Sequence, residues 1–371
     1  MKKNTLFISA VMAISLVLTA CTSSRVDAPI DTATVEPVKE APIEPEPEPE
    51  PEPVTITITA AGDCSIGKLS IHGYYGSLNQ YFDENGPEYF FDGVKDVFSN
   101  DDMTIVNFEG VLTESETIVE KQYNIKGRPE FISVLPVSSI EAVSFGNNHR
   151  EDYGRVSLED TVALFEQENI TYAYEDVVGM YEVKDKVIGI VSVNEVYDGV
   201  DKTKELLLAG IEELKANNCD LIICCPHWGV EGNHKIENYQ QEIAYLCIDN
   251  GADLVLGCHP HVLQGMECYK DKMILYSMGN FCFGGNMNPK DKQTMIFQQT
   301  FTFDPAGDLV TDLDARVIPC TLSSVDNKND YQPTIRDGEK GQAILDNLNL
   351  YSQDFNIVLD DEGKVSTVQK D

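Results

Sequence analysis

Basic residues are scarce in this sequence: 27 Lys and Arg stand against 62 Asp and Glu, which gives a formal net charge of −35. Such a surface repels phosphate backbones, so the composition argues against a nucleic-acid partner. The nine cysteines after Cys21 include no CxxC pair that could hold zinc, and they lack the pattern of a disulfide framework. Internal repeats are also missing. The 371 residues, 42% of them hydrophobic, suffice for one large α/β domain or two small ones.

The first 21 residues have the pattern of a bacterial lipoprotein signal peptide. Two lysines precede an apolar stretch over residues 6–18, which is too short to span a membrane comfortably. Residues 18–21, Leu-Thr-Ala-Cys, resemble the lipobox, and this implies that Cys21 becomes the lipidated N-terminus after cleavage. We therefore expect an extracytoplasmic protein that reaches the membrane through a lipid anchor at Cys21. An uncleaved anchor helix is the alternative, and it leaves the rest of the chain on the same side.

Residues 22–53 are polar, acidic and rich in proline, and they end in a Glu-Pro alternation over residues 44–53. Proline fixes φ and neighbouring glutamates repel one another. The composition therefore predicts a disordered, extended spacer between the lipid anchor and the folded part.

The folded part is expected to begin at Val54, where the sequence VTITITA alternates with the period of a strand. Apolar runs then alternate with helical patterns, which indicates an α/β fold with a largely parallel central sheet. We expect strands at residues 54–60, 103–108, 186–193, 220–225, 252–257 and 273–278, and helices at about 157–168, 201–218 and 236–250. Ser157, with Asp160 three residues later, is expected to cap the first helix.

We place the main domain at residues 54–323 and a C-terminal extension at residues 324–371, with a helical stretch near 338–352. Whether this extension docks on the sheet stays open at this point.

Polar side chains with metal-binding chemistry directly follow several of the predicted strands. Because loops at the carboxyl ends of parallel strands meet at one crevice, we expect these side chains to converge. Carboxylate, amide oxygen and neutral imidazole together suit divalent ions such as Mn, Zn, Fe or Mg. The residues in question are Asp63, Glu109, Asn147, Asn148, His149, His227, His259 and His261, and Trp228, Glu231 and His234 come soon after His227.

The order of these motifs resembles the poly-gamma-glutamate capsule biosynthesis family, or CapA family. The segments that carry the resemblance are GDCSIG (62–67), NFEG (107–110), GNNHREDYG (146–154), PHWGVE (226–231), GADLVLGCHPHVLQG (251–265) and YSMGNFCFG (276–284). They cover about residues 55–285, and the His-Pro-His and Gly-Asn-Phe segments are the most specific. The family looks related to the calcineurin-like metallophosphoesterases. The resemblance thus implies a four-layered α-β-β-α sandwich of the metallophosphoesterase type with a dinuclear metal site.

The resemblance also implies a role for each of these residues. Asp63 and His261 would bind one metal, Glu109 would bridge both metals, and His149 would be the general acid for the leaving group. The second metal would be held by Asn148, His227 and His259. The chain departs from the phosphoesterase pattern at Ser65, where those enzymes have a His ligand. One or two bound divalent ions are therefore both consistent with the sequence.

Further residues are weighed beside these ligands. Asp152 could orient His149, with a surface or helix-cap role as the alternative. Lys126 and Arg128 could pair with an anionic substrate, although surface salt bridging is the preferred interpretation. Trp228 is expected to pack beside the site, with stacking on a ligand as the alternative, and Asn280 of the Gly-Asn-Phe segment is a candidate substrate-binding residue. His72 and His234 are assigned to the surface.

Two main functions are compatible with the sequence. The first is a metal-dependent hydrolase of poly-gamma-glutamate capsule synthesis or export, which cleaves a phosphoester or a polymer amide bond outside the membrane. The second is a non-catalytic subunit that holds the anionic polymer through bound metal, together with membrane-embedded polyglutamate synthase subunits. A structural lipoprotein with a decayed site is a third interpretation.

Overall fold

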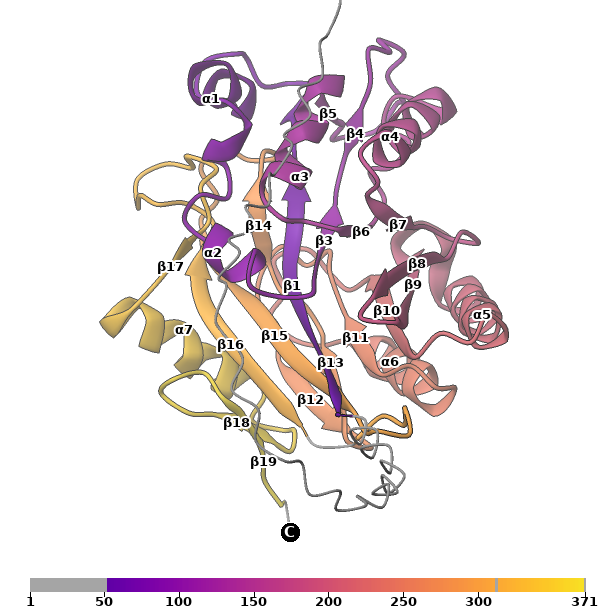
Figure 1. The fold of residues 1–371 in the computed structure, drawn as a ribbon. Helices are drawn as coiled ribbons and strands as arrows, with labels where there is room; N and C mark the ends of the chain where they lie inside the picture. Colours follow the sequence, from indigo (N-terminus) through magenta and orange to yellow (C-terminus); the bar gives the residue numbers. More distant parts are fainter. Residues whose placement is uncertain (1–51, 311–312, 370–371) are drawn as a thin grey trace, which may run out of the picture. The chain divides into compact units, whose positions relative to one another are not determined.

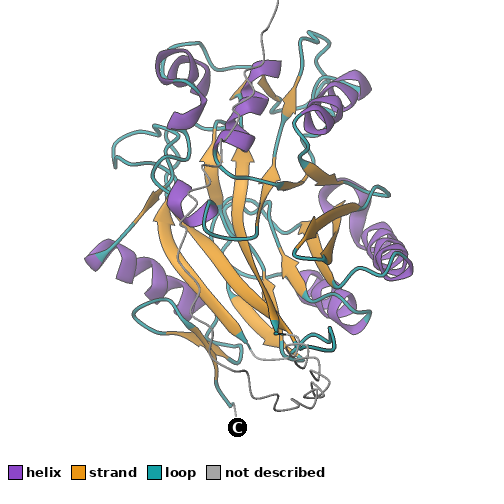
Figure 2. Ribbon diagram, in the orientation of Figure 1, coloured by secondary structure: helices purple, strands orange, loops and turns teal. Residues whose placement is uncertain are grey.

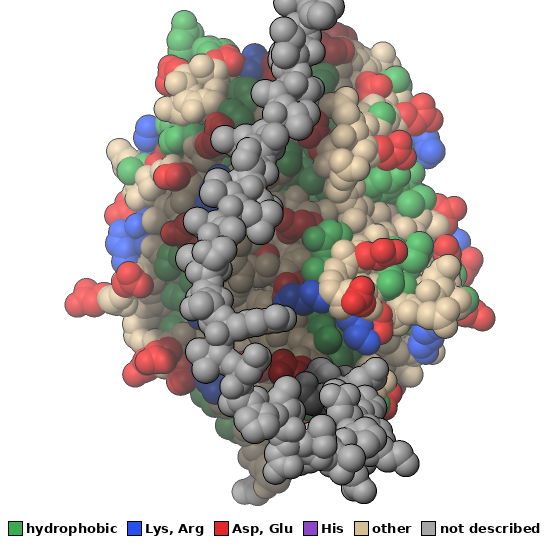
Figure 3. All heavy atoms as spheres, viewed as in Figure 1, with side chains coloured by type: hydrophobic (Ala, Val, Ile, Leu, Met, Phe, Trp, Pro, Cys, Tyr) green, Lys and Arg blue, Asp and Glu red, His purple; other side chains and the backbone are tan. Residues whose placement is uncertain are grey.

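The computed structural model describes residues 52–310 and 313–369 (Figure 1). The signal peptide, Cys21 and the spacer up to residue 51 lie outside the described residues. Within the described ranges, no helix combines the length and the apolar character needed to cross a membrane. Asp and Glu side chains outnumber Lys and Arg on the face drawn in Figure 3, in line with the net charge.

The first large sheet has the strand order β17-β16-β15-β1-β3-β6-β7, and β14 also pairs with β1. Strand β1 runs parallel to β3 and β14 and antiparallel to β15. The sheet is therefore mixed. Its strands are β1 (Val54–Ser65), β3 (Met103–Phe108), β6 (Ala142–Ser144), β7 (Thr171–Ala173), β14 (Asn280–Phe283), β15 (Gln293–Phe303), β16 (Asp314–Thr321) and β17 (Thr334–Ile335).

The second large sheet has the order β12-β13-β11-β10-β9-β8. Its inner strands are parallel, whereas β8 and β12 pair antiparallel with their neighbours. The prediction of one largely parallel central sheet was therefore wrong: hairpin strands add antiparallel edges, and the strands divide between two sheets. The strands are β8 (Gly179–Val183), β9 (Lys186–Asn194), β10 (Leu221–His227), β11 (Leu254–Leu256), β12 (Met266–Tyr269) and β13 (Lys272–Leu275).

Helices lie outside the strands on both sides (Figure 2). Phe165 of α4 packs in the core outside the first sheet, while Ile211 of α5 and Ile243 of α6 pack outside the second. The helices are α1 (Leu78–Asn85), α2 (Lys95–Phe98), α3 (Val134–Val137), α4 (Arg155–Gln167), α5 (Glu195–Ala216), α6 (Asn238–Asp249) and α7 (Gly338–Tyr351), with 3₁₀ turns η1 (Pro87–Tyr89) and η2 (Pro129–Ser133). Small sheets join β2 (Lys68–Leu69), β5 (Ile125–Gly127) and β4 (Val111–Leu112), and β18 (Ile357–Leu359) and β19 (Val365–Thr367).

A third core lies between the two sheets, and strand β10 shows how one strand serves two cores. Ile223 faces the inter-sheet core, and its neighbours Ile222 and Cys224 face the core under the helices. Because successive side chains of a strand point to opposite faces, a strand buried on both faces becomes a continuous apolar run. The four-layered α-β-β-α sandwich expected from the resemblance is thereby confirmed.

One helix start differs from the sequence prediction, and a second helix has an additional turn before its predicted start. Helix α4 begins at Arg155 after Gly154, so Ser157 lies in the first turn, and its Oγ donates to the Gly154 carbonyl at 2.7 Å. The prediction of a Ser157 cap was therefore wrong. Helix α5 (Glu195–Ala216) consists of two helical pieces separated at Gly199, where φ is 71°, and the long piece after Gly199 starts next to the predicted residue 201. Glycine tolerates this left-handed conformation, which the periodic pattern alone does not reveal.

The C-terminal stretch packs on the domain. Leu345 and Leu348 of α7 are almost fully buried in the inter-sheet core, and Val365 of β19 joins them. Strand β17 extends the first sheet by pairing with β16. Residues beyond 323 thus complete the same hydrophobic core.

Candidate metal centre

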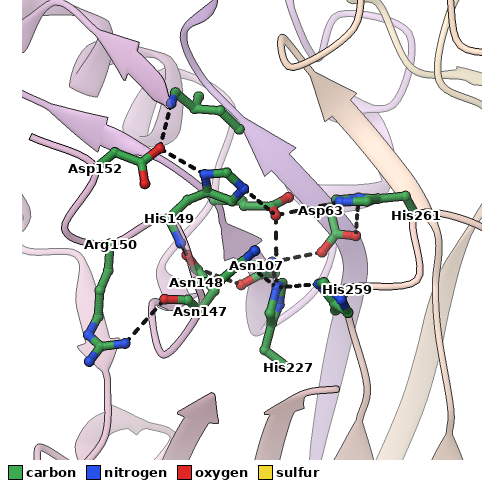
Figure 4. A network of polar contacts seen from close by, with 12 residues as sticks. Asp63, Asn107, Asn147, Asn148, His149, Arg150, Asp152, His227, His259 and His261 are labelled. Carbon is green, nitrogen blue, oxygen red and sulfur yellow. Dashed lines mark hydrogen bonds and ion pairs between the residues drawn. The ribbon is translucent and has the colours of Figure 1, made fainter. Parts of the chain in front are cut away.

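The six predicted metal ligands lie together where strands of both sheets end: Figure 4 labels five of them, and the sixth, Glu109, lies within 4 Å of His227 and His261. Met103, Ile105 and Asn107 of β3 alternate onto the inter-sheet face, and Glu109 directly follows on the same side. On β1 the pairing register shifts between Ala61 and Asp63. Such a bulge re-aims the side chain that follows it. We call the following residues the six-residue cluster: Asp63, Glu109, Asn148, His227, His259 and His261.

The Glu109 carboxylate lies at the centre of this cluster. It is 0% exposed, and neither of its oxygens makes a hydrogen bond among the described residues. Its Oε1 lies 3.7 Å from Nε2 of His149, 3.8 Å from Nε2 of His227 and 3.7 Å from Nε2 of His261. These distances exceed a hydrogen bond. Buried carboxylates are normally paired or bound to metal, so a shared cation satisfies this arrangement.

Only one oxygen of the Asp63 carboxylate accepts a hydrogen bond. Its Oδ1 accepts a hydrogen bond from Asn107 Nδ2 at 2.7 Å, whereas its Oδ2 has no hydrogen bond and lies 3.1 Å from His261 Nδ1. Asn280 fixes His261: its amide donates to the His261 carbonyl at 3.0 Å, and its Oδ1 lies 3.0 Å from Nδ1. Asn280 was predicted to bind substrate, and in the structure its side chain contacts the predicted ligand His261. Ligand atoms of Asp63, Glu109 and His261 all lie within 4.8 Å of one another.

The second half of the cluster is centred on His227. Its Nε2 lies 3.0 Å from Asn148 Oδ1 and 3.1 Å from His259 Nδ1. Both His259 and His261 have positive φ values, 102° and 59°. Such conformations cost about 1–3 kcal/mol for residues other than glycine, and they occur mainly at functional sites.

A further carboxylate, Glu231, was not predicted as a ligand. One of its oxygens and the ring nitrogens of His259 and His261 lie within 4.8 Å of one another. The sequence signal that could have indicated it is the HWGVE segment, which places Glu231 four residues after His227.

The burial of these groups sets their charges. Burial lowers the pKa of His227 well below its usual value and that of His259 to about 4, so both rings are neutral at pH 7 and can offer a lone pair. Burial raises the pKa of Glu109 to about 8. For His261, burial is outweighed by the carboxylates of Glu109 and Asp63, which raise its pKa to about 10. Metal binding at such a site displaces protons from the ligands.

His149 is held beside the cluster by Asp152. The His149 Nδ1 lies 2.7 Å from Asp152 Oδ2, which also accepts a hydrogen bond from the Ile125 amide at 2.5 Å. Asp152 is 1% exposed, so the alternative surface role is wrong. Lys121, which sequence reasoning missed, pairs with Asp152 and lies 2.7 Å from the Asn148 carbonyl. Nothing in the sequence separates Lys121 from an ordinary surface lysine.

Three predicted substrate contacts have partners within the protein. Lys126 pairs with Glu116 at 2.7 Å, and Arg128 pairs with Asp83 and Glu130, so both take part in the surface salt bridges given as the preferred interpretation. Trp228 is fully buried, and its indole N–H donates to a backbone carbonyl at 2.8 Å. It packs beside the site, and stacking on a ligand is ruled out because no face of the ring is open.

The two histidines assigned to the surface, His72 and His234, are both half-buried. The His234 ring stacks on Tyr351 with centroids 4.6 Å apart, and its Nδ1 contacts the Leu263 carbonyl. His234 therefore helps to dock the C-terminal stretch. It also lines a surface cavity of about 950 Å³ beside Tyr245 and Tyr351, and no residue of the six-residue cluster lines that cavity.

The donor set fits divalent ions. Carboxylates, an amide oxygen and neutral imidazoles converge, and no thiolate takes part, because burial raises the pKa of the nearest thiols, Cys64 and Cys258, far above the usual range. Such a mixture of nitrogen and oxygen donors suits Mn, Zn, Fe or Mg.

Comparison with known proteins gives a family match over most of this region. The family model described as bacterial capsule synthesis protein PGA_cap matches residues 57–285. The capsule biosynthesis protein CapA of Bacillus anthracis is 29% identical over 231 residues, which are 56% of this chain and 55% of that protein. The PGA biosynthesis protein CapA of Bacillus subtilis (strain 168) is 27% identical over 227 residues, 54% and 58% of the two chains. The match spans little more than half the length of these relatives.

Two solved structures are similar in fold. A novel phosphatase from Mycoplasma pneumoniae matches with a TM-score of 0.43 and 13% identity, covering 75% of this chain and 96% of that one. The purple acid phosphatase PPD1 from yellow lupin seeds matches with a TM-score of 0.33 and 10% identity, covering 80% and 56%. Both scores are below 0.5, so these likenesses say nothing about the chemistry of the site.

Proposed function

The chain belongs to the family of the bacterial capsule synthesis protein PGA_cap, and we propose that it is a metal-dependent hydrolase of capsule synthesis. Its substrate is a phosphoester or an amide bond of an anionic polymer such as poly-gamma-glutamate. The observation that carries the proposal is His149, which is buried, bonded to Asp152 and directed at the Glu109 carboxylate. A subunit that only holds polymer needs metal ligands but has no use for a positioned proton donor.

The six-residue cluster would hold the metal. Asp63, Glu109 and His261 form one group, and Asn148, His227 and His259 form the other. Divalent ions bound there would polarise the oxygen of the scissile group and lower the pKa of an attacking water.

The protein's own residues fix the geometry of the reaction. With Nδ1 bonded to Asp152, the His149 ring presents Nε2 to the cluster, 3.7 Å from Glu109 Oε1. From this position it can deliver a proton to the leaving group. Burial lowers the pKa of His149, and Asp152 opposes this effect. Only the protonated ring carries a proton on Nε2, so Asp152 supports the acid role by stabilising that form.

The test distinguishes the proposed general acid, His149, from the proposed metal ligands. The folded domain is stripped with a chelator, reloaded with Mn²⁺ or Zn²⁺, and assayed on model phosphoesters and gamma-glutamyl peptides. We expect His149→Asn to retain metal and lose turnover, and His227→Asn to lose both, while His72→Asn, outside the cluster, behaves as wild type. Metal binding and polymer retention without any turnover would contradict hydrolysis and leave the polymer-holding role.

We also propose that the protein works outside the cytoplasmic membrane as a lipoprotein, beside membrane-embedded polymer synthase subunits. Support comes from the lipobox-like segment that ends at Cys21. Labelling cells with a radioactive fatty acid should mark the wild-type protein and leave Cys21→Ala unlabelled. Label on Cys21→Ala, or none on wild type, would contradict this part of the proposal.

A further inference from the structure

The loop after β10 is fixed against the His259-Pro260-His261 segment. The Trp228 amide donates to the Cys258 carbonyl at 3.0 Å, and the Gly232 amide donates to the Pro260 carbonyl at 2.8 Å. Gly229 and Gly232 have φ values of 92° and 71°, which glycine adopts without strain. Hydrogen bonds on both sides of Glu231 therefore hold its backbone beside the two histidines.

The Glu231 carboxylate extends the six-residue cluster toward solvent. Glu231, His259 and His261 form one group of close ligand atoms, and Asp63, Glu109 and His261 form another. The two groups share His261. Glu231 is exposed, whereas Asp63 and Glu109 are fully buried. Asp63 and Glu109 thus reach the site from the protein interior, whereas Glu231 lies on its solvent side.

The buried side of the site has unsatisfied oxygens but lacks one strong donor. Both oxygens of Glu109 and Oδ2 of Asp63 make no hydrogen bond among the described residues. Ser65 is also fully buried, and its hydroxyl has no hydrogen-bond partner there. A neutral serine hydroxyl is a weak ligand compared with a carboxylate or an imidazole. A cation at Asp63, Glu109 and His261 would therefore have only these three strong protein ligands.

We propose that Glu231 is a metal ligand, which supplies its carboxylate to a cation held through His261. This inference rests on the proposed metal site and adds to it a residue that closes the site from the solvent side. Because the carboxylate is exposed in the metal-free protein, its removal should weaken metal binding without disturbing the fold.

The experiment measures metal binding rather than activity. The wild-type domain, Glu231→Gln and a matched control, Glu213→Gln, are stripped and titrated with Mn²⁺ against a competing chelator, and bound metal is counted by elemental analysis. Glu213 is exposed on α5, so the control makes the same charge change away from the cluster. Removal of residues that merely support a ligand lowers metal affinity about 10–100-fold. We therefore expect Glu231→Gln to bind Mn²⁺ at least tenfold more weakly, and Glu213→Gln to match wild type.

Each outcome decides one of the two proposals. If wild type binds Mn²⁺ and Glu231→Gln binds it equally well, the ligand role of Glu231 is wrong and the metal site stands. If wild type binds no Mn²⁺ or Zn²⁺, the metal site fails, and the role of Glu231 fails with it. An equal loss in both glutamine variants would show a general charge effect and would also overturn the inference. Thermal unfolding of the metal-free variants should match wild type, because Glu231 is exposed.

Discussion

Replacing Glu109 with Gln should stabilise the metal-free protein. The carboxylate is fully buried without a hydrogen bond, and its burial raises the pKa of Glu109 from 4.5 to about 8. Between these pH values the folded state binds more protons than the unfolded state, so stability falls as pH rises toward 8. At about 1.4 kcal/mol for each pKa unit, the upper limit of the loss is about 5 kcal/mol. The raised pKa already includes the opposing effect of the neighbouring charge on His261.

We therefore expect Glu109→Gln to raise the free energy of unfolding by about 1–3 kcal/mol in chelator at pH 8, and by less at pH 5. Saturating metal should reverse the sign. Metal at about 100 times its Kd stabilises a protein that binds it by about 2.7 kcal/mol, and the variant should lose this gain because it lacks a proposed metal ligand.

Urea unfolding with and without chelator, at both pH values, measures these differences by linear extrapolation. Asp63→Asn is a useful comparison, because Asp63 already accepts one hydrogen bond and should gain less. A Glu109→Gln protein that is less stable than wild type in chelator at pH 8 would refute the reasoning, since the carboxylate would then have a stabilising partner.

Three further predictions follow from single residues. Asp152→Asn should lower turnover about 10–100-fold and leave metal content unchanged, because Asp152 holds His149 rather than the metal; steady-state kinetics and elemental analysis check this. Leu348→Ala should cost about 2–5 kcal/mol in urea unfolding, because Leu348 is fully buried between the sheets, and a loss under about 1 kcal/mol would mean that α7 contributes little to the core. Burial raises the pKa of Asp101 to about 7, so stability should fall between pH 4 and pH 7, and Asp101→Asn should flatten that slope.

The clustering of the candidate ligands could be predicted because strand periodicity and strand ends are local features. Glu109 and His227 stand at or just after runs that the sequence identifies as strands, and β3 has the predicted bounds. Strands of one sheet end at a common edge, so the residues that directly follow them lie near one another. Six residues that are far apart in the sequence could therefore be grouped from the sequence alone. The alternation that directs Glu109 inward also follows from counting residues along β3.

The division into two sheets could not be predicted from periodicity. Ile222 and Ile223 are both buried, on opposite faces, and their neighbours are equally apolar. A continuous apolar run of this kind occurs in a strand of a single sheet that has helices on both faces. It occurs equally in a strand of one of two stacked sheets, so the run does not distinguish the two architectures. The resemblance to the CapA family supplied the four layers, whereas the residue pattern alone favoured one sheet.

Roles that depend on precise side-chain contacts were the hardest to assign. Asp152 is three residues after His149, which fits an orienting partner, a helix cap and a surface acid alike. Only the buried geometry, with its amide donor from Ile125, selects the first. For Trp228, packing beside the site was the preferred interpretation and stacking on a ligand the alternative, and the complete burial of the ring selects packing.

The electrostatics of the site impose an order of binding. The chain carries a net charge of −35, and an anionic polymer is repelled over about 10 Å at 0.1 M salt. In the cluster His227 and His259 are neutral at pH 7, so only His261 offsets the carboxyl groups of Asp63 and Glu109. The metal-free site thus gives an anion no net attraction. Under the proposed function, bound divalent ions would add positive charge to the site, so we expect metal to bind before a phosphoester or polyglutamate does. Polymer binding should therefore disappear when chelator is added, even in the His149→Asn variant, which keeps all six ligands.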